Sequence, residues 1–302
     1  MRKPFEVTVL GTSSATPTKY RHPSSQFVRL EGNYMLLDCG EGTQRQLARY
    51  GLKMQRISHV FITHLHGDHY FGLVGLLSSL SLLGRTQELD LFGPPELKQI
   101  LDIQLVWELG YPLNFHSLNF QESITIVDHK AVEVISFPVK HSVPTCGFQF
   151  IERKRKRILL PEKAREFEVP KYFYTKLTEG TDYIKADGTV VSNEHLTLPG
   201  SVPKKYVYAA DTQFLPELKQ YFADADVLYH ETTYLQADTS KAHLRMHATT
   251  VEAAEMAMKS RVKKLLIGHF SSKYKDLSPF LEEAQSIFAN TELALEGTTF
   301  DI

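Results

Sequence analysis

Short blocks of apolar and polar residues alternate along most of the chain, and they predict strands interspersed with helices. Continuous or alternating apolar runs predict strands over residues 5–11, 25–30, 34–40, 57–64, 123–128, 131–139, 146–152, 204–211, 225–231 and 263–270. Apolar residues at helical spacing predict helices over residues 42–51, 70–84, 94–107, 214–222, 249–260 and 278–289. Thr249 and Glu252 have the spacing of a capping box, which starts a helix just after His247. This mixture of elements predicts an α/β fold.

The segment 152–204 breaks this rhythm. It carries charges, prolines and glycine-containing turns such as "TEGTD" and "ADGTV", with little periodicity that would place it in a core. We therefore expect a single domain over residues 1–302 with an inserted, flexible arm at 152–204, rather than a second domain. The arm begins with consecutive basic residues, which are Arg153, Lys154, Arg155, Lys156 and Arg157. A charge run on its own commonly marks a solvated loop.

Composition limits the classes of function. The chain has 302 residues, of which 42% are hydrophobic and 23% charged, as expected for a folded, water-soluble protein. Neither a signal-peptide h-region nor a run of eighteen apolar residues is present, so we expect a cytoplasmic protein that does not enter a membrane. Cys39 and Cys146 are too few for a disulfide framework. Because the net charge is only −1, any attraction for a polyanion must be local.

The segment "THLHGDH", directly after a predicted strand, predicts a metal site. Residues two apart in an extended or turning backbone point the same way, so His64 and His66 can share one ion while Asp68 and His69 reach another. Imidazole and carboxylate ligands without thiolate suit zinc, with manganese or iron as substitutes. Four ligands cannot saturate two ions, so we expect further ligands downstream.

Three downstream residues fit that expectation. His141, Asp211 and His269 each come just after a predicted strand. Ligands in open α/β sheets collect at the carboxyl ends of strands, so these side chains are expected to converge with the histidine loop. Any one of them alone would more commonly be a capping or surface group. Their matching positions together favour the ligand interpretation.

At this point the chain resembles the metallo-β-lactamase fold hydrolases and, within them, the short form of tRNase Z. "THLHGDH" is shared by the whole superfamily. Narrower likeness comes from "LLDCGEGTQRQ", "YHETTY", "MHATTVEAAEMA" and "IGHFSSKY", which resemble the family's corresponding segments. The resemblance covers essentially the full length. It implies a four-layer αβ/βα sandwich with an inserted exosite arm.

The resemblance also implies how the site is built. Two zinc ions per subunit would be held, one by His64, His66 and His141, the other by Asp68, His69 and His269, with Asp211 bridging both. Two ions about 3.5 to 4 Å apart can activate water for attack on a phosphodiester. Asp68 is the family's proposed general base. His247, oriented by Glu231, is the candidate acid that protonates the leaving oxygen.

By the same resemblance the substrate is precursor tRNA, cut on the 3′ side of the discriminator nucleotide to leave 3′-hydroxyl and 5′-phosphate ends. The related enzymes are homodimers in which one subunit's arm serves the other's active site, so the basic run at 153–157 would be part of an exosite. Lys19 and Arg21 in "PTKYRH" match the family's "PxKxRN" loop, which handles nucleotides beside the cleavage site. His22 stands where that loop has asparagine.

Two other functions stay open on the sequence. One is a fold relative that hydrolyses a small ester, thioester or phosphodiester, with the arm as a lid. The other is an RNA-binding protein with a non-catalytic metal site. The complete ligand set together with Glu231 and His247 argues against the second, because a protein that only binds RNA has no need for a general acid.

Overall fold

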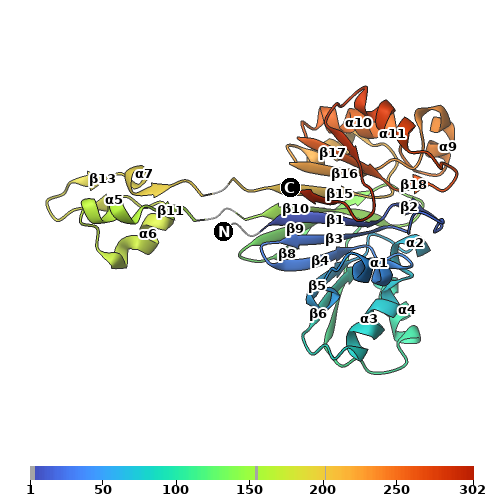
Figure 1. Cartoon of the computed structure of the whole chain (residues 1–302), viewed down its shortest axis with the longest axis horizontal. Helices are drawn as coiled ribbons and strands as arrows, with labels where there is room; N and C mark the ends of the chain where they lie inside the picture. Colours follow the sequence, from blue (N-terminus) through green and yellow to red (C-terminus); the bar gives the residue numbers. More distant parts are fainter. Residues whose placement is uncertain (1–3, 154–155, 201) are drawn as a thin grey trace. The chain divides into compact units, whose positions relative to one another are not determined.

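The computed structural model describes residues 4–153, 156–200 and 202–302 (Figure 1). The chain forms two compact units, one made of Met1–Ile151 and Lys204–Ile302 and the other of Glu152–Pro203. We call them the sandwich unit and the arm unit. The arm unit occupies the range of the predicted arm. Its flexibility and its role in binding substrate stay predictions.

The sandwich unit contains two seven-stranded sheets. The first has the order β20 (Thr299–Asp301), β1 (Phe5–Gly11), β3 (Ser25–Leu30), β4 (Asn33–Leu37), β5 (Ile57–Phe61), β6 (Leu89–Gly93) and β7 (Leu113–Ser117). The second has the order β19 (Thr291–Leu293), β17 (Lys264–Gly268), β16 (Val227–Glu231), β15 (Lys205–Ala209), β10 (Thr145–Glu152), β9 (Val132–Val139) and β8 (Ile124–Asp128). Strands β4 to β7 are parallel, as are β15, β16, β17 and β19. Two short strands, β2 (Ser13–Ser14) and β18 (Phe270–Ser271), pair with each other.

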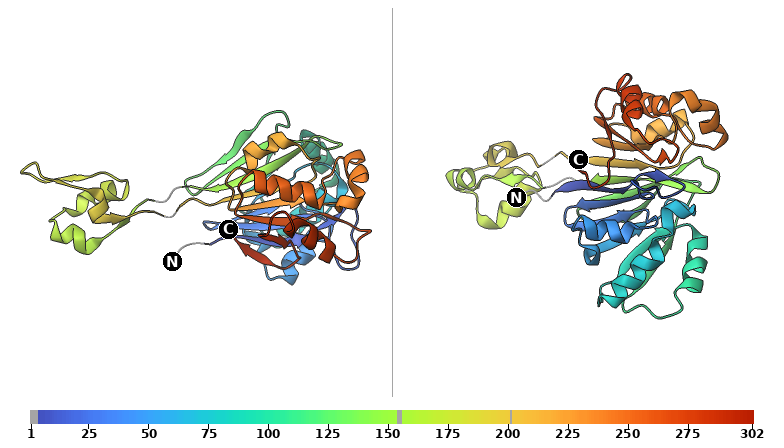
Figure 2. Two further views of the ribbon diagram at one scale, coloured as in Figure 1. Left: turned by 90° about the horizontal axis from the view of Figure 1, so that it is seen from above. Right: turned by 45° about the vertical axis from the view of Figure 1, so that its right-hand side comes forward.

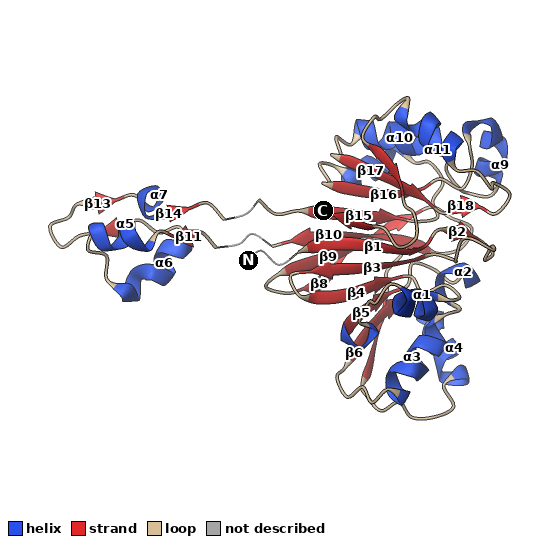
Figure 3. Cartoon of the chain, viewed as in Figure 1, coloured by secondary structure: helices blue, strands red, loops and turns tan. Residues whose placement is uncertain are grey.

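The two large sheets pack face to face, and helices cover both outer faces. Aromatic and aliphatic side chains from both sheets form the central core, including Phe61, Phe148 and Tyr208. Helices α1 (Thr43–Arg49), α3 (Leu73–Leu82) and α4 (Pro95–Gln104) contribute to a second core on the first sheet, and α8 (Lys219–Phe222), α10 (Thr250–Lys259) and α11 (Ser278–Gln285) to a third on the second sheet. Figure 3 and the right-hand view of Figure 2 show these helix groups on opposite sides of the strands. The predicted αβ/βα four-layer sandwich is confirmed.

Local differences from the predicted elements have identifiable causes. Strands β6 and β7 were not predicted, because each is a five-residue run between longer helical patterns. The helix predicted over 70–84 is observed as α3, which starts at Leu73, and it is separated from the preceding turn α2 (Gly67–Tyr70). At the division the Gly72 N–H donates to the Cys39 carbonyl at 2.8 Å, outside the helical ladder. A Cβ at Gly72 would lie 2.2 Å from the Gly40 oxygen, so only glycine allows this close contact.

Other short elements lie between the strands. They are η1 (Met54–Arg56), η3 (Pro216–Leu218), η4 (Gln236–Asp238) and α9 (Thr239–Leu244). The predicted capping box at the start of α10 is present, with the side chains of Thr249 and Glu252 bonding reciprocally to backbone N–H groups. Among the described residues, none of the helices combines the length and apolar character that crossing a bilayer requires.

The arm unit has its own secondary structure, which the sequence analysis did not predict. Strand β11 (Ile158–Leu159) pairs with β14 (Thr197–Leu198), and β12 (Tyr183–Ile184) pairs with β13 (Val190–Val191). Helical turns are η2 (Lys171–Phe173), α5 (Pro161–Glu166), α6 (Tyr174–Thr178) and α7 (Asn193–Leu196). They enclose a small core of Ala164, Val169, Leu177, Val191 and Leu196. Elements of two to six residues are too short to give the periodic signal from which longer helices are predicted.

Candidate active site

The predicted metal ligands converge at one end of the sandwich unit. They lie in the loop after β5, in α2, and just beyond the ends of β9, β15 and β17. Their donor atoms form groups within 4.8 Å, which include His64 with His66, His141 and Asp211, and Asp68 with His69 and His269. Asp211 and His269 have positive φ angles of 43° and 60°, respectively. Such left-handed backbone in non-glycine residues is costly and concentrates at functional sites.

The Asp211 carboxylate faces both groups of ligands. Its Oδ2 lies 3.6 Å from His64 Nε2, 3.7 Å from His141 Nε2 and 3.4 Å from His69 Nε2. Its Oδ1 lies 3.0 Å from His269 Nε2. One carboxylate at this position can contact two ions, one in each group.

Two further observations test whether these residues fit a metal. The buried atoms His69 Nε2 and Asp211 Oδ1 make no hydrogen bond, a costly state that a coordinated cation would relieve. Burial lowers the pKa of His64 well below its ordinary value and also lowers the pKa of His66 and of His141. Lowered pKa values favour the neutral imidazole that binds metal. A donor set of imidazole nitrogens and carboxylate oxygens fits zinc and similar divalent ions.

The second ring nitrogen of four of these histidines is held by a neighbouring group. His64 Nδ1 lies 2.9 Å from the Thr63 hydroxyl and His69 Nδ1 lies 2.7 Å from Asp38 Oδ2. His269 Nδ1 lies 2.9 Å from the Thr233 hydroxyl, and His141 Nδ1 lies 2.9 Å from the Met246 carbonyl. Such contacts orient metal-binding rings.

Sequence reasoning missed the most connected of these partners, Asp38. Besides His69, its carboxylate accepts hydrogen bonds from the Thr63 N–H at 2.8 Å and from the Tyr208 hydroxyl at 3.0 Å. Asp38 is fully buried and has a φ of 51°. A signal was available, because Asp38 directly follows an apolar strand, as the predicted ligands do.

Glu231 and His247 form a pair beside the ligands. Glu231 ends β16, is fully buried, and its Oε1 lies 2.8 Å from His247 Nδ1. Burial alone lowers the pKa of His247, but the Glu231 carboxylate more than offsets it and raises the pKa to about 9. The contact with Glu231 therefore favours the protonated imidazole. The His247 ring centroid lies 4.9 Å from that of His141 and 5.5 Å from that of His269.

His230 lies next to this pair, and Asp68 belongs to one of the ligand groups. His230 points away from this pair, with its Nδ1 2.7 Å from the Glu231 carbonyl oxygen and its ring against Phe222. Asp68 Oδ2 accepts a hydrogen bond from the Ala15 N–H at 2.7 Å. Burial alone raises the pKa of Asp68, but the nearby His69 and His269 bring it below its usual range, so the carboxylate is ionised.

The two predicted substrate-binding residues of the sandwich unit, Lys19 and Arg21, differ in how far their side chains are already engaged by the protein. Lys19 Nζ lies over the exposed ring of Tyr20, 5.2 Å from its centroid. The Arg21 guanidinium instead donates to the carbonyls of Ser271 and Tyr274 at 3.1 and 3.0 Å. Arg21 therefore ties its loop to the segment after β17. His22 Nδ1 lies 2.9 Å from Glu296 Oε2.

In the arm unit, two basic residues of the predicted run already have partners. Lys156 Nζ lies 2.7 Å from Glu179 Oε1 in an exposed ion pair, and Arg157 Nε donates to the Thr197 hydroxyl at 2.6 Å. Arg153 also has an interaction partner, while Lys154 and Arg155 lie outside the described residues. The exposed Lys156 pair is weak, whereas Arg157 ties the residue before β11 to the start of β14.

A four-layer αβ/βα sandwich with these histidines and aspartates at its strand ends defines a metallo-β-lactamase fold protein. A family model described as anti-Pycsar protein Apyc1 matches residues 5–138. The chain is 40% identical over 301 residues to the ribonuclease Z of Porphyromonas gingivalis (strain W83), covering 99% of both chains. It is 39% identical over 296 residues to the ribonuclease Z of Bacteroides fragilis (strain YCH46), covering 97% of both. The chain belongs to the ribonuclease Z family.

Solved structures agree with this assignment. The short form of human tRNase Z superimposes with a TM-score of 0.71 at 26% identity, covering 98% of each chain. The metallo-β-lactamase fold protein YhfI from Bacillus subtilis superimposes with a TM-score of 0.69 at 17% identity, covering 99% of this chain and 100% of that one. The second likeness shows the fold alone.

Proposed function

We propose that this ribonuclease Z family member is a metal-dependent endoribonuclease that removes the 3′ trailer of precursor tRNA. Cleavage after the discriminator nucleotide would leave 3′-hydroxyl and 5′-phosphate ends. The observation that carries the proposal is the presence, in a chain 40% identical to ribonuclease Z over nearly its full length, of a complete donor set beside a buried carboxylate–imidazole pair.

Two divalent ions, zinc or manganese among them, would be held as the family resemblance implies. One would bind His64, His66 and His141, the other Asp68, His69 and His269, with Asp211 contacting both. When bound, such ions supply Lewis acidity at the phosphate and lower the pKa of water. The remaining steps belong to the chain's own side chains.

His247 is proposed as the general acid. Its Nδ1 is engaged by Glu231, so Nε2 is the atom that would donate a proton to the departing 3′ oxygen of the discriminator nucleotide. Glu231 is held in turn by the N–H groups of Thr233 and Ala248, at 2.9 and 3.1 Å, which fix the orientation of the pair. Asp68, whose Oδ2 accepts the Ala15 N–H and lies 3.4 Å from His269 Nε2, would accept the proton of the attacking water.

The proposed homodimer is supported by where the insertion joins the sandwich unit. Ile151 and Lys205 are opposed partners on β10 and β15. Asp211 follows the other end of β15, roughly 20 Å away at about 3.3 Å per residue. Both ends of the insertion therefore join β10 and β15 at the strand ends opposite the metal ligands. This is suited to an arm that serves a second subunit.

An exposed apolar surface at the ends of α3 and α4 is the candidate contact between subunits. Its members are Leu82, Leu83, Ile103, Val106 and Trp107, with exposures between 51% and 87%. The segment after α4 is tied to α3 by a hydrogen bond from the Gly110 N–H to the Ser81 hydroxyl at 2.8 Å. Exposed apolar side chains that form one patch mark association surfaces.

The direct test maps the ends produced from a precursor tRNA. Purified protein with zinc should release the trailer in one cut, with a 3′-hydroxyl on the discriminator nucleotide and a 5′-phosphate on the trailer. Cleavage elsewhere, or turnover of small aryl phosphodiesters without any action on the precursor, would contradict the proposal.

A further inference from the structure

Three neighbouring cavities in the sandwich unit meet at one pair of residues, Tyr34 and Arg56. Their volumes are about 560, 380 and 520 Å³, and both residues line all three. Tyr34 lies near the start of β4, and Arg56 immediately precedes β5. The metal ligands follow the other end of β5, a strand about 17 Å long at five residues. The three cavities are therefore separate from the active site.

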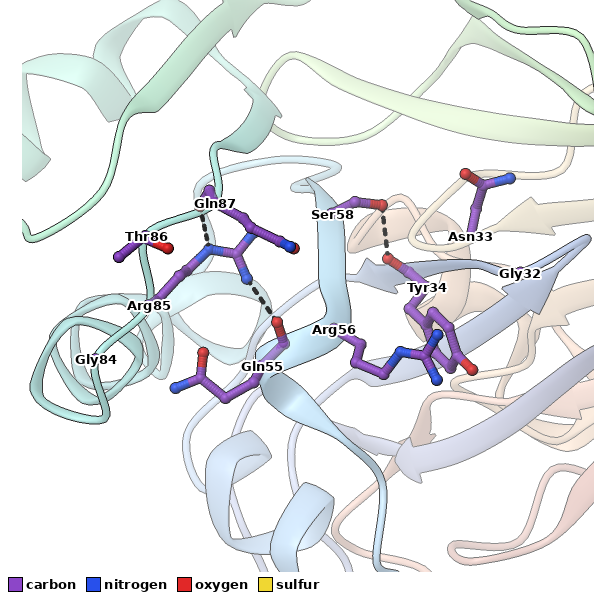
Figure 4. Close-up of a pocket in the computed structure, with 10 residues that line it drawn as sticks. All are labelled: Gly32, Asn33, Tyr34, Gln55, Arg56, Ser58, Gly84, Arg85, Thr86 and Gln87. Carbon is purple, nitrogen blue, oxygen red and sulfur yellow. Dashed lines mark hydrogen bonds between the residues drawn. The ribbon is translucent and has the colours of Figure 1, made fainter.

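The largest cavity carries two guanidinium groups on different walls (Figure 4). Arg56 is exposed, and its guanidinium carbon lies 4.4 Å from the centroid of the Tyr34 ring. Arg85 is only 5% exposed and donates to the carbonyls of Gln87, Gln55 and Glu88 at 2.7, 2.9 and 2.6 Å. These partners are neutral, so the positive charge of Arg85 is held close to the cavity without a carboxylate.

The rest of the lining is also suited to an anion. Asn33, Gln55, Ser58, Thr86 and Gln87 contribute neutral polar groups to the largest cavity, and its described lining contains no acidic residue. The adjoining cavities add Lys53 and Arg29, together with Glu6 and Glu31. Arg29 already pairs with Glu6, at 2.6 Å. In a chain with a net charge of −1, this is a local excess of positive charge.

The stacked arrangement of Arg56 adds a second kind of recognition. The Arg56 guanidinium lies over the Tyr34 ring, and the Phe27 ring contacts Tyr34 at a centroid distance of 5.9 Å. A guanidinium held in this way can offer its outer face to a nucleobase while its N–H groups bind phosphate. A volume of about 560 Å³ lies within the range of small-ligand sites.

We propose that the Tyr34–Arg56 cavity is an auxiliary nucleotide-binding site, which binds one phosphate-bearing nucleotide unit between Arg56 and the wall that contains Arg85. The unit is either part of a single-stranded RNA or a free nucleotide. The RNA version rests on the proposed function, whereas binding of a free nucleotide does not.

The test compares Arg56→Ala and Arg56→Glu with Arg49→Ala. Arg49 is a matched control, because it is also exposed, stacks over a tyrosine (Tyr50, 5.7 Å) and lines none of the three cavities. Equilibrium binding of AMP and of a ten-nucleotide single-stranded RNA to the metal-loaded protein is measured by calorimetry and fluorescence anisotropy. We expect Arg56→Ala to weaken binding about tenfold and Arg56→Glu to weaken it further, with Arg49→Ala within about twofold of wild type.

Salt dependence gives a second readout. Removal of one phosphate contact should reduce the slope of log K against log salt by about 0.7 for a single-stranded RNA. If only the affinity for the RNA depends on Arg56, the cavity binds single-stranded RNA. If the affinity for AMP depends on Arg56, the cavity binds a free nucleotide. Equal binding of both probes by the Arg56 and Arg49 variants would overturn the proposal. Precursor tRNA cleavage by the same wild-type preparation is scored separately, so that failure of the proposed function is distinguished from failure of this site.

Discussion

The sandwich unit and the arm unit hold their functional side chains in opposite ways. In the sandwich unit, the proposed ligands His64 and His69 are buried, and their Nδ1 atoms contact Thr63 and Asp38. In the arm unit, a core of five buried residues supports an exposed surface on which Lys156 pairs loosely with Glu179. Catalysis requires fixed positions. Attraction of a polyanion requires only accessible charge.

The strongest way to break the sandwich unit's function is to remove the carboxylate that faces both ligand groups. Asp211→Ala should abolish precursor cleavage, with a loss of at least about a thousandfold, because both ions lose a ligand. Elemental analysis should find fewer than two metal ions per subunit. Asp224→Ala removes an exposed aspartate that pairs with Arg261, and it should retain wild-type metal content and activity. Full metal content in Asp211→Ala would show that this residue is not a ligand.

Removal of the proposed acid should have a smaller effect and leave the metal in place. His247→Ala is expected to lower turnover of precursor tRNA about a hundredfold, in the range of general acid–base contributions. Bound metal should be unchanged, because His141 and His269 keep their other contacts. His243→Ala, which removes an exposed histidine paired with Glu252, serves as the control. Near-wild-type turnover of His247→Ala would remove it from the mechanism.

Deletion of the arm unit tests whether the arm contributes to the binding of precursor tRNA. Because Ile151 and Lys205 are directly opposed on β10 and β15, an Asn-Gly turn can replace residues 152–204 and close a two-residue hairpin. We expect precursor tRNA cleavage to fall about tenfold or more and to lose much of its salt dependence. Hydrolysis of a small aryl phosphodiester, followed by absorbance, should change little. Equal loss on both substrates would contradict an exosite in the arm.

The same deletion can show whether the arm acts between subunits. Arm-deleted protein is mixed with Asp211→Ala protein, and the subunits are allowed to exchange. If the arm serves the partner's site, mixed dimers contain one intact site served by one intact arm, and precursor cleavage recovers above the level of either variant alone. No recovery, in a mixture shown by light scattering and affinity capture to contain mixed dimers, would favour an arm that serves its own subunit.

The comparison also explains what the sequence could predict. The convergence of the predicted ligands could be foreseen, because strand ends restrict their positions, as with His141 and Asp211. The α/β character followed from long periodic segments, whereas the four-layer arrangement was implied by the family resemblance. Asp38 was missed because an aspartate after a strand has several ordinary roles, and its partners His69 and Tyr208 are distant in sequence. The range of the arm unit was predicted, but its helices and strands were missed because they are too short for periodicity to appear.

The smallest expected effect comes from the removal of a single hydrogen bond to Asp38, which contacts His69. Tyr208→Phe removes only the hydroxyl that donates to Asp38 Oδ2, and the carboxylate keeps Thr63 and His69 as partners. We expect zinc affinity, measured by chelator competition, to fall by less than about tenfold, since direct partners of ligands typically contribute ten- to a hundredfold. The free energy of unfolding should fall by about 1 to 2 kcal/mol, because one buried hydrogen bond is lost.

Tyr206→Phe is the matched control, because it removes another fully buried tyrosine hydroxyl, which donates to Gln26 and does not contact Asp38. Its loss of stability should be similar, with zinc affinity unchanged. If both variants weaken zinc equally, the effect comes from the core between the sheets and not from Asp38. If neither does, Thr63 holds Asp38 well enough to orient His69, and the position of His69 is set by the strand ends of the first sheet rather than across the two sheets.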